Sequence, residues 1–127
     1  MADIAVSILR WVADEPQPGF VEFSIVDCDG RDWRFVDKLP VVTAEDLDKT
    51  SAYPRPGSVR CKILSFDHDA AGREIALIDT DKPWCIQTAD EGHMFRVFAD
   101  QLDRNVPQNE EPERIGIETI VFTATKR

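Results

Sequence analysis

The sequence predicts an all-β fold: a mostly antiparallel small barrel or sandwich of about eight strands with one or two short helical turns. Apolar and polar residues alternate in short runs along most of the 127 residues, which is the period of a strand with one buried face. Turn-forming residues separate these runs, so that neighbouring strands can pair as a meander. Closing such a sheet into a barrel or folding it into a sandwich removes exposed strand edges.

Strand-breaking residues mark the boundaries of the predicted elements. The loop 14–19 (DEPQPG) ends the first strand because proline has no amide hydrogen to donate to a strand ladder. Asp29 and Gly30 are typical of a tight hairpin turn. Short helical turns are expected at 43–48 and 98–103. The alternation places the strands at 4–12, 21–25, 33–35, 59–63, 75–78, 84–88, 95–97 and 115–125.

The chain is predicted to form one β-rich domain over residues 1–104. Residues 105–114 (NVPQNEEPER) have the composition of a flexible linker. The segment 115–127 is rich in β-branched residues and is expected either to complete the domain or to pair across a homodimer. Core positions are those that hold the apolar phase of each strand, namely Phe23, Ile25, Phe35, Ile63, Leu77, Ile86 and Val97.

Charge and composition narrow the possible partners. The formal net charge is −9, from 24 acidic and 15 basic side chains. This charge repels phosphate backbones, so nucleic acid is not expected as a partner, whereas a basic protein or a cationic ligand is favoured. No apolar run approaches the length of a membrane span and no export signal is visible. We therefore expect a cytoplasmic protein whose three cysteines are reduced.

The predicted binding residues come from loops at one end of the meander, because consecutive connections alternate between its two ends. Prolines stiffen these loops, which lowers the entropic cost of binding. The aromatic side chains among them are of the kind that anchors interfaces, and the charged ones are of both signs. The predicted binding residues are Trp11, Asp37, Lys38, Tyr53, Arg55, Asp79, Lys82 and Trp84.

The opposite end of the meander collects acidic residues and both histidines, His68 and His93. Neither the spacing of a zinc site nor that of an EF-hand is present, so we expect no metal there. The chain also contains no phosphate-binding loop, nucleophile elbow or C-x-x-C motif, and no cofactor is expected. Asp37 and Asp79 are the residues that could converge as an acid–base pair, which leaves catalysis open.

Four phrases resemble small bacterial proteins of similar size that carry no assigned function. They are RWVADEPQPG (10–19), FVDKLP (35–40), YPRPG (53–57) and DKPW (81–84). The resemblance implies a bacterial, cytoplasmic protein and assigns no active site. In length and acidity the chain is also similar to bacterial immunity proteins, which neutralise toxins by binding them.

Together these features favour a non-catalytic, immunity- or adaptor-like module that binds another protein, and the acidic charge favours a basic partner. A small-molecule-binding β-barrel with its ligand at the Trp11/Trp84 end is the alternative. An enclosed pocket with convergent polar groups would favour the small-molecule ligand, whereas an aromatic patch with a polar rim would favour the protein partner.

Overall fold

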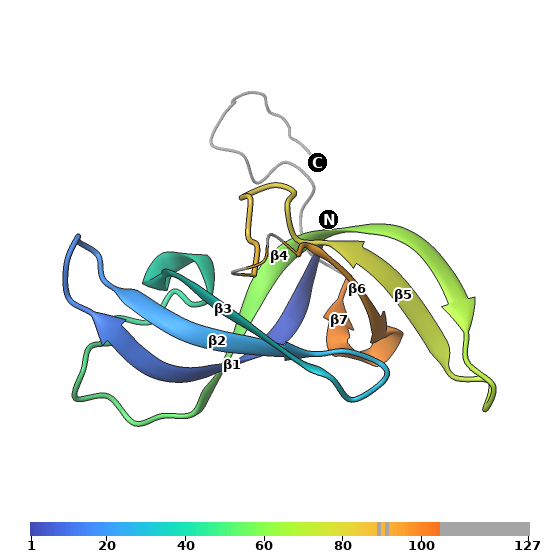
Figure 1. The fold of residues 1–127 in the computed structure, drawn as a ribbon, viewed down its shortest axis with the longest axis horizontal. Coiled ribbons are helices and arrows are strands. Elements are labelled where there is room, and N and C mark those ends of the chain that lie inside the picture. Colours follow the sequence, from blue (N-terminus) through green and yellow to red (C-terminus); the bar gives the residue numbers. More distant parts are fainter. Residues whose placement is uncertain (89, 91, 105–127) are drawn as a thin grey trace.

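Seven strands form one curled, half-barrel antiparallel sheet in the computed structural model, which describes residues 1–88, 90 and 92–104 (Figure 1). The predicted all-β, mostly antiparallel fold is therefore confirmed. Two three-residue 3-10 helices are the helical elements of this part of the chain. The elements are β1 (Ala2–Ala13), β2 (Phe20–Val26), β3 (Asp32–Lys38), η1 (Leu39–Val41), β4 (Arg55–His68), β5 (Glu74–Asp79), β6 (Met94–Phe98), η2 (Ala99–Gln101) and β7 (Leu102–Asp103).

The strand order is β3-β2-β1-β4-β5-β6, and β7 pairs with β1. The predicted simple meander is wrong at one point, because β4 pairs with β1 and not with β3. The segment between β3 and β4 carries the chain from the edge of the sheet back to β1. β4 then serves both halves of the sheet: Arg55–Cys61 pairs with β1, and Lys62–His68 pairs with β5.

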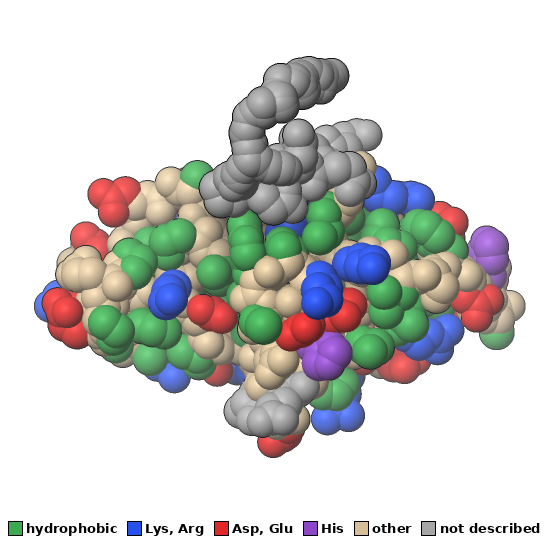
Figure 2. All heavy atoms as spheres, turned by 90° about the horizontal axis from the view of Figure 1, so that it is seen from above, with side chains coloured by type: hydrophobic (Ala, Val, Ile, Leu, Met, Phe, Trp, Pro, Cys, Tyr) green, Lys and Arg blue, Asp and Glu red, His purple; other side chains and the backbone are tan. Residues whose placement is uncertain are grey.

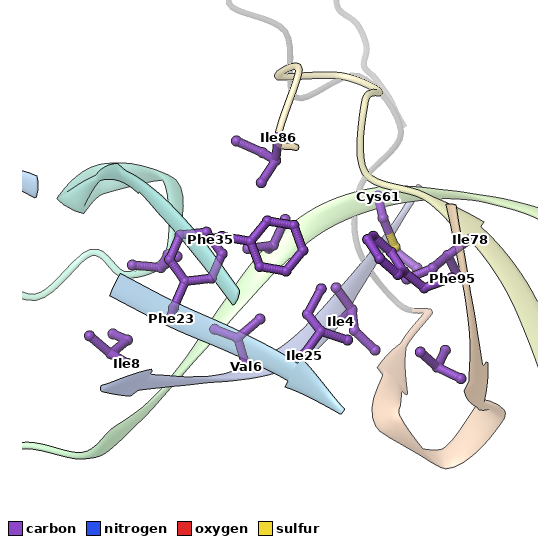
Figure 3. Close-up of a cluster of buried hydrophobic side chains, with 14 of the residues drawn as sticks. Ile4, Val6, Ile8, Phe23, Ile25, Phe35, Cys61, Ile78, Ile86 and Phe95 are labelled. Atoms are coloured by element: carbon purple, nitrogen blue, oxygen red, sulfur yellow. The ribbon is translucent and has the colours of Figure 1, made fainter. Parts of the chain in front are cut away.

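The core lies inside the curl of the sheet, where buried side chains from both halves meet (Figure 3). The rings of Phe23 and Phe35 stack with centroids 5.1 Å apart, and the edge of the Phe35 ring meets Phe95 with centroids 5.7 Å apart. Because these rings come from β2, β3 and β6, they hold the two ends of the open sheet together.

Two hydrogen bonds reinforce this closure at the tip of the β2–β3 hairpin. The amide of Cys28 donates to the carbonyl oxygen of Arg96 on β6 at 2.7 Å. The Gln101 side chain donates to the carbonyl of Val26 at 2.9 Å. The hairpin tip is thereby tied to the far edge of the sheet.

Five of the seven predicted core residues are buried, but Ile63 and Leu77 are only partly so. At Ile63 the cause is an irregularity of β4 between Ile63 and Ser65, which interrupts its alternation. On β5, Ala76 and Ile78 occupy the inward phase, so Leu77 points to the other face.

Three local predictions differ from the structure. Residues 84–88 form no strand, because the loop after β5 is held by its own hydrogen bonds, including one from the Ile86 amide to the Thr80 carbonyl at 3.0 Å. Residues 43–48 form no helical turn; Thr43 Oγ1 accepts from the amide of Glu45 at 3.0 Å in a tighter turn. The helical turn predicted at 98–103 is shorter, since η2 is followed directly by β7.

The predicted linker 105–114 and terminal strand 115–127 lie outside the described residues. Within the part of the chain that is described, no helix is long and apolar enough to span a membrane.

Candidate functional site

The eight predicted binding residues fall into two separate groups, because β1 is long and its two ends meet different neighbours. Trp11 pairs with Val21 at one end of β1, whereas Ala2 pairs with Cys61 at the other. Nine residues of strand, at about 3.3 Å each, put about 30 Å of strand between Trp11 and Ala2. The expectation of one shared end assumed a simple meander, in which consecutive connections alternate between the two ends, but β4 pairs with β1 and not with β3.

Trp11 belongs to the first group and is fixed by the loop that follows β1. Its indole Nε1–H donates to Asp14 Oδ1 at 2.8 Å, and its ring packs against Gly19. This half-buried side chain therefore closes the loop 14–19 and is not free to anchor a partner.

Tyr53 and Arg55, also in the first group, hold the long segment before β4 in place. The Tyr53 hydroxyl donates to the Asp48 carbonyl oxygen at 2.8 Å. The Arg55 guanidinium pairs with Glu45 at 2.9 Å. These contacts join distant residues of the segment to one another. Both side chains therefore have a structural role in this segment.

Asp37 and Lys38 lie at the end of β3, an edge strand of the sheet. The Asp37 carboxylate accepts a hydrogen bond from the Lys38 amide at 2.7 Å. Three strands, β2, β1 and β4, separate β3 from β5, which carries Asp79, in the sheet order. The sheet pairing therefore does not unite Asp37 and Asp79 as the acid–base pair that was considered.

The second group, Asp79, Lys82 and Trp84, lies where β5 ends and does form a cluster with residues of other elements. Trp84 is 46% exposed, and the Arg60 guanidinium lies 5.9 Å from the centroid of its ring. Arg60 Nε in turn donates to Asp3 Oδ1 at 2.6 Å. The indole is thus placed beside a guanidinium that β1 holds in position.

Asp79 joins the cluster to β6 through a side-chain contact with His93. Its Oδ1 accepts from His93 Nδ1 at 2.7 Å and from the Asp81 amide at 2.9 Å. The buried Thr80 hydroxyl next to it donates to the Ile86 carbonyl oxygen at 2.6 Å. His93 was expected at the opposite end of the sheet. The β5–β6 pairing of Asp79 with Met94 is the signal that would have placed it here.

The exposed thiol of Cys85 faces a carboxylate. A hydrogen bond from the thiol, followed by one from the Gln87 amide, lowers the pKa of Asp81. The same hydrogen bond and the charge of Asp81 raise the pKa of Cys85 above its ordinary value. Cys85 therefore stays protonated near neutral pH, which does not suit a catalytic nucleophile.

Next to these residues lies a basic pocket of about 560 Å³, lined by Met1, Lys62, Ile63, Lys82 and Arg104. Of its lining only Lys82 was among the predicted binding residues. Lys62 is in register with Asp79, so the pocket adjoins the Asp79–His93 pair. Basic and acidic side chains gather near the middle of the face in Figure 2. Sequence patterns gave no indication of Arg104, because its position depends on the pairing of β7 with β1.

The cluster can bind a ligand through charge and aromatic contact. The described residues include no group of three or more His, Cys, Asp or Glu side chains arranged to hold a metal ion. Comparisons with protein-family models, with curated proteins and with solved structures found no match for this chain.

Proposed function

We propose that this protein is a non-catalytic module that binds another protein through the surface around Trp84 and Met94. The observation that carries the proposal is the exposure of these two large apolar side chains, 46% for Trp84 and 53% for Met94. Met94 is in register with Asp79, and Trp84 lies in the turn that follows Asp79. Tryptophan and methionine are enriched at protein interfaces.

Charged residues around this apolar pair supply the polar rim that a protein interface has. Arg60 and Lys62 lie on one side, on the outer face of β4, since Val59 and Cys61 point inward. Asp79 lies between Lys62 and Met94 in the register of β4, β5 and β6. A rim that carries both positive and negative charges gives the interface specificity and orients the partner as it approaches.

The overall charge of −9 supports a basic partner. The electrostatic field of the protein would accelerate the association of such a partner. An immunity- or adaptor-like role in the cytoplasm is consistent with such a partner. Trp11 and Tyr53, by contrast, are tied to their own loops. The proposed interface is therefore narrower than the eight residues predicted from the sequence.

The proposal is tested by capturing partners with the tagged full-length protein from cells that produce it, followed by binding measurements with each purified partner. Trp84→Ala is expected to weaken the binary complex about 30-fold, the effect of removing a hot-spot residue worth about 2 kcal/mol. Val36→Ala is the matched control, because Val36 is 51% exposed on the distant strand β3. Equal affinities of the parent protein and Trp84→Ala for every partner would reject this surface as the interface.

A further inference from the structure

We propose that the basic pocket lined by Lys62, Lys82 and Arg104 binds a small polyanion, an organic molecule with two or more carboxylate or phosphate groups. This inference goes beyond the proposed protein-binding function and does not depend on it. Its basis is that the fold brings cationic side chains from three distant segments to a pocket of ligand size in a strongly acidic protein.

The convergence follows from the sheet topology. Lys62 follows Cys61, the residue at which β4 leaves β1 and begins to pair with β5. Lys82 lies in the turn after β5, and Arg104 directly follows β7. Since β4 and β7 both pair with the first residues of β1, their basic side chains meet near Met1, which also lines the pocket.

The two lysines are available to a ligand because the carboxylates beside them make their closest contacts with other groups. Asp79, opposite Lys62, accepts from His93 at 2.7 Å. Asp81, next to Lys82, accepts from Gln87 at 3.0 Å. Among the described residues, no carboxylate lies within ion-pair distance of Lys62 or Lys82. Gathering like charges costs free energy, and a bound anion would offset that cost.

Arg104 is held in place for this role. Its guanidinium lies 4.8 Å from the centroid of the Phe66 ring and pairs with Glu74 at 3.5 Å. The ring and the carboxylate each contact the side chain and limit its motion, so less entropy is lost when Arg104 contacts an anion. The Arg104 side chain remains about half exposed beside Glu74, so an anion in the pocket can still approach the guanidinium.

The size and lining of the pocket indicate an organic anion. Its volume of about 560 Å³ is that of a small-molecule site. The partly buried Ile63 and the side chain of Met1 add apolar surface to the cationic lining. A ligand with a short carbon skeleton between its charged groups would contact both kinds of surface. Lysine ammonium groups donate to carboxylate or phosphate oxygens without a fixed geometry, so the pocket suits either kind of anion.

The probes for this site are citrate, inorganic pyrophosphate and, as a cation control, spermidine, each titrated into the full-length protein at low ionic strength and followed by two-dimensional NMR. We expect saturable binding of citrate or pyrophosphate, with the largest shifts at the amides of the pocket residues. The anion that binds more tightly identifies the ligand as carboxylate- or phosphate-bearing. Lys62→Gln and Lys82→Gln should each weaken binding about five-fold, as expected for one charge-assisted contact.

Lys49→Gln is the matched control, because it removes the same charge from an exposed residue of the segment before β4. It should leave the affinity within about two-fold of the parent protein. Three outcomes would each overturn the proposal: no saturable binding of either anion, an equal loss of affinity in Lys49→Gln, or shifts centred away from Lys62, Lys82 and Arg104. None of these measurements involves a protein partner, so they leave the proposed interface at Trp84 untouched.

Discussion

Gly19 and the indole of Trp11 are in such close contact that a Cβ built on Gly19 would lie 2.4 Å from Cη2 of the ring. Gly19 also has a φ of +100°, which side chains other than glycine's rarely adopt. On the same edge of the indole, Nε1–H donates a hydrogen bond to Asp14 Oδ1. Asp14 and Gly19, the first and last residues of the loop between β1 and β2, therefore both contact the indole of Trp11 and close the loop.

Gly19→Ala is expected to destabilise the protein by about 2–4 kcal/mol, the sum of backbone strain at positive φ and displacement of the indole. Gly30→Ala is the control, since Gly30 has a φ of +81° but nothing within 4 Å of a built Cβ. It should cost about 1 kcal/mol through strain alone. Denaturant unfolding measures both changes, and equal losses would show that the contact with Trp11 is unimportant.

Phe35→Ala should destabilise the protein by about 3–5 kcal/mol through lost burial and the cavity left behind. Phe35 is 2% exposed and contacts both Phe23 and Phe95. Val36→Ala, at the next residue, should change the free energy of unfolding by less than about 0.5 kcal/mol because Val36 is half exposed. An unfolding midpoint of Phe35→Ala equal to that of the parent would contradict the assigned core.

The ionisation of Asp27, at the tip of the β2–β3 hairpin, makes the stability of the protein depend on pH. Burial by itself raises the pKa of Asp27, but hydrogen bonds from the Trp33 indole and from the amides of Arg31 and Asp29 lower it below its ordinary value of 3.8. A carboxyl whose pKa is lower in the folded state stabilises the protein above its unfolded pKa. That stability is lost as the pH falls through the folded pKa.

Asp27→Asn should therefore lower stability near neutral pH and make the free energy of unfolding fall less steeply between about pH 5 and pH 2. Trp33→Phe keeps an aromatic ring but removes the Nε1–H donor that lies 2.9 Å from Asp27 Oδ2, and it should reduce the slope in the same direction. Urea unfolding at several pH values measures these slopes. A slope in Asp27→Asn as steep as in the parent would refute the linkage.

The alternation of residues predicted most of the strands because burial of one face fixes the side-chain period. The hairpin at Asp29 and Gly30 was predictable for a similar reason, since its turn is encoded by two adjacent residues. The pairing of β4 with β1 was not predictable from local pattern. It depends on contacts between residues about 50 positions apart, such as Ile4 with Val59.

That one pairing explains why the candidate site was only partly predicted. Asp79, Lys82 and Trp84 were found because turn residues and a proline mark the end of β5. Arg60, Lys62 and Arg104 join them through the pairing of β4 with β1 and β5 and through the two-residue strand β7. The period of the sequence indicates only residues 59–63 of β4 and does not indicate β7. Residues 84–88 were predicted as a strand because Trp84 and Ile86 alternate, although the backbone amides of Cys85 and Ile86 donate to carbonyls of the same loop, those of Asp81 and Thr80.

The last prediction concerns thiol reactivity, which separates the two cysteines nearest the candidate site. Cys61 is fully buried, and burial raises the pKa of its thiol to about 12. Cys85 is exposed, but its hydrogen bond to Asp81 and the charge of that carboxylate raise its pKa as well. Iodoacetamide reacts with the thiolate. In the folded protein at about pH 8, Cys85 should react slowly and Cys61 should not react until the chain unfolds.

Asp81→Asn tests the cause of the slow reaction. Removing the carboxylate removes the charge that disfavours the thiolate, so alkylation of Cys85 should become several-fold faster and its pH midpoint should fall. The rate at Cys61, measured in the same sample by peptide mass spectrometry, is the internal control for folding, because it rises only if the core opens. A faster rate at Cys61 in Asp81→Asn would mean that the substitution opens the core, so that the change at Cys85 could not be assigned to the charge of Asp81. An unchanged rate at both cysteines would mean that Asp81 does not control the Cys85 thiol.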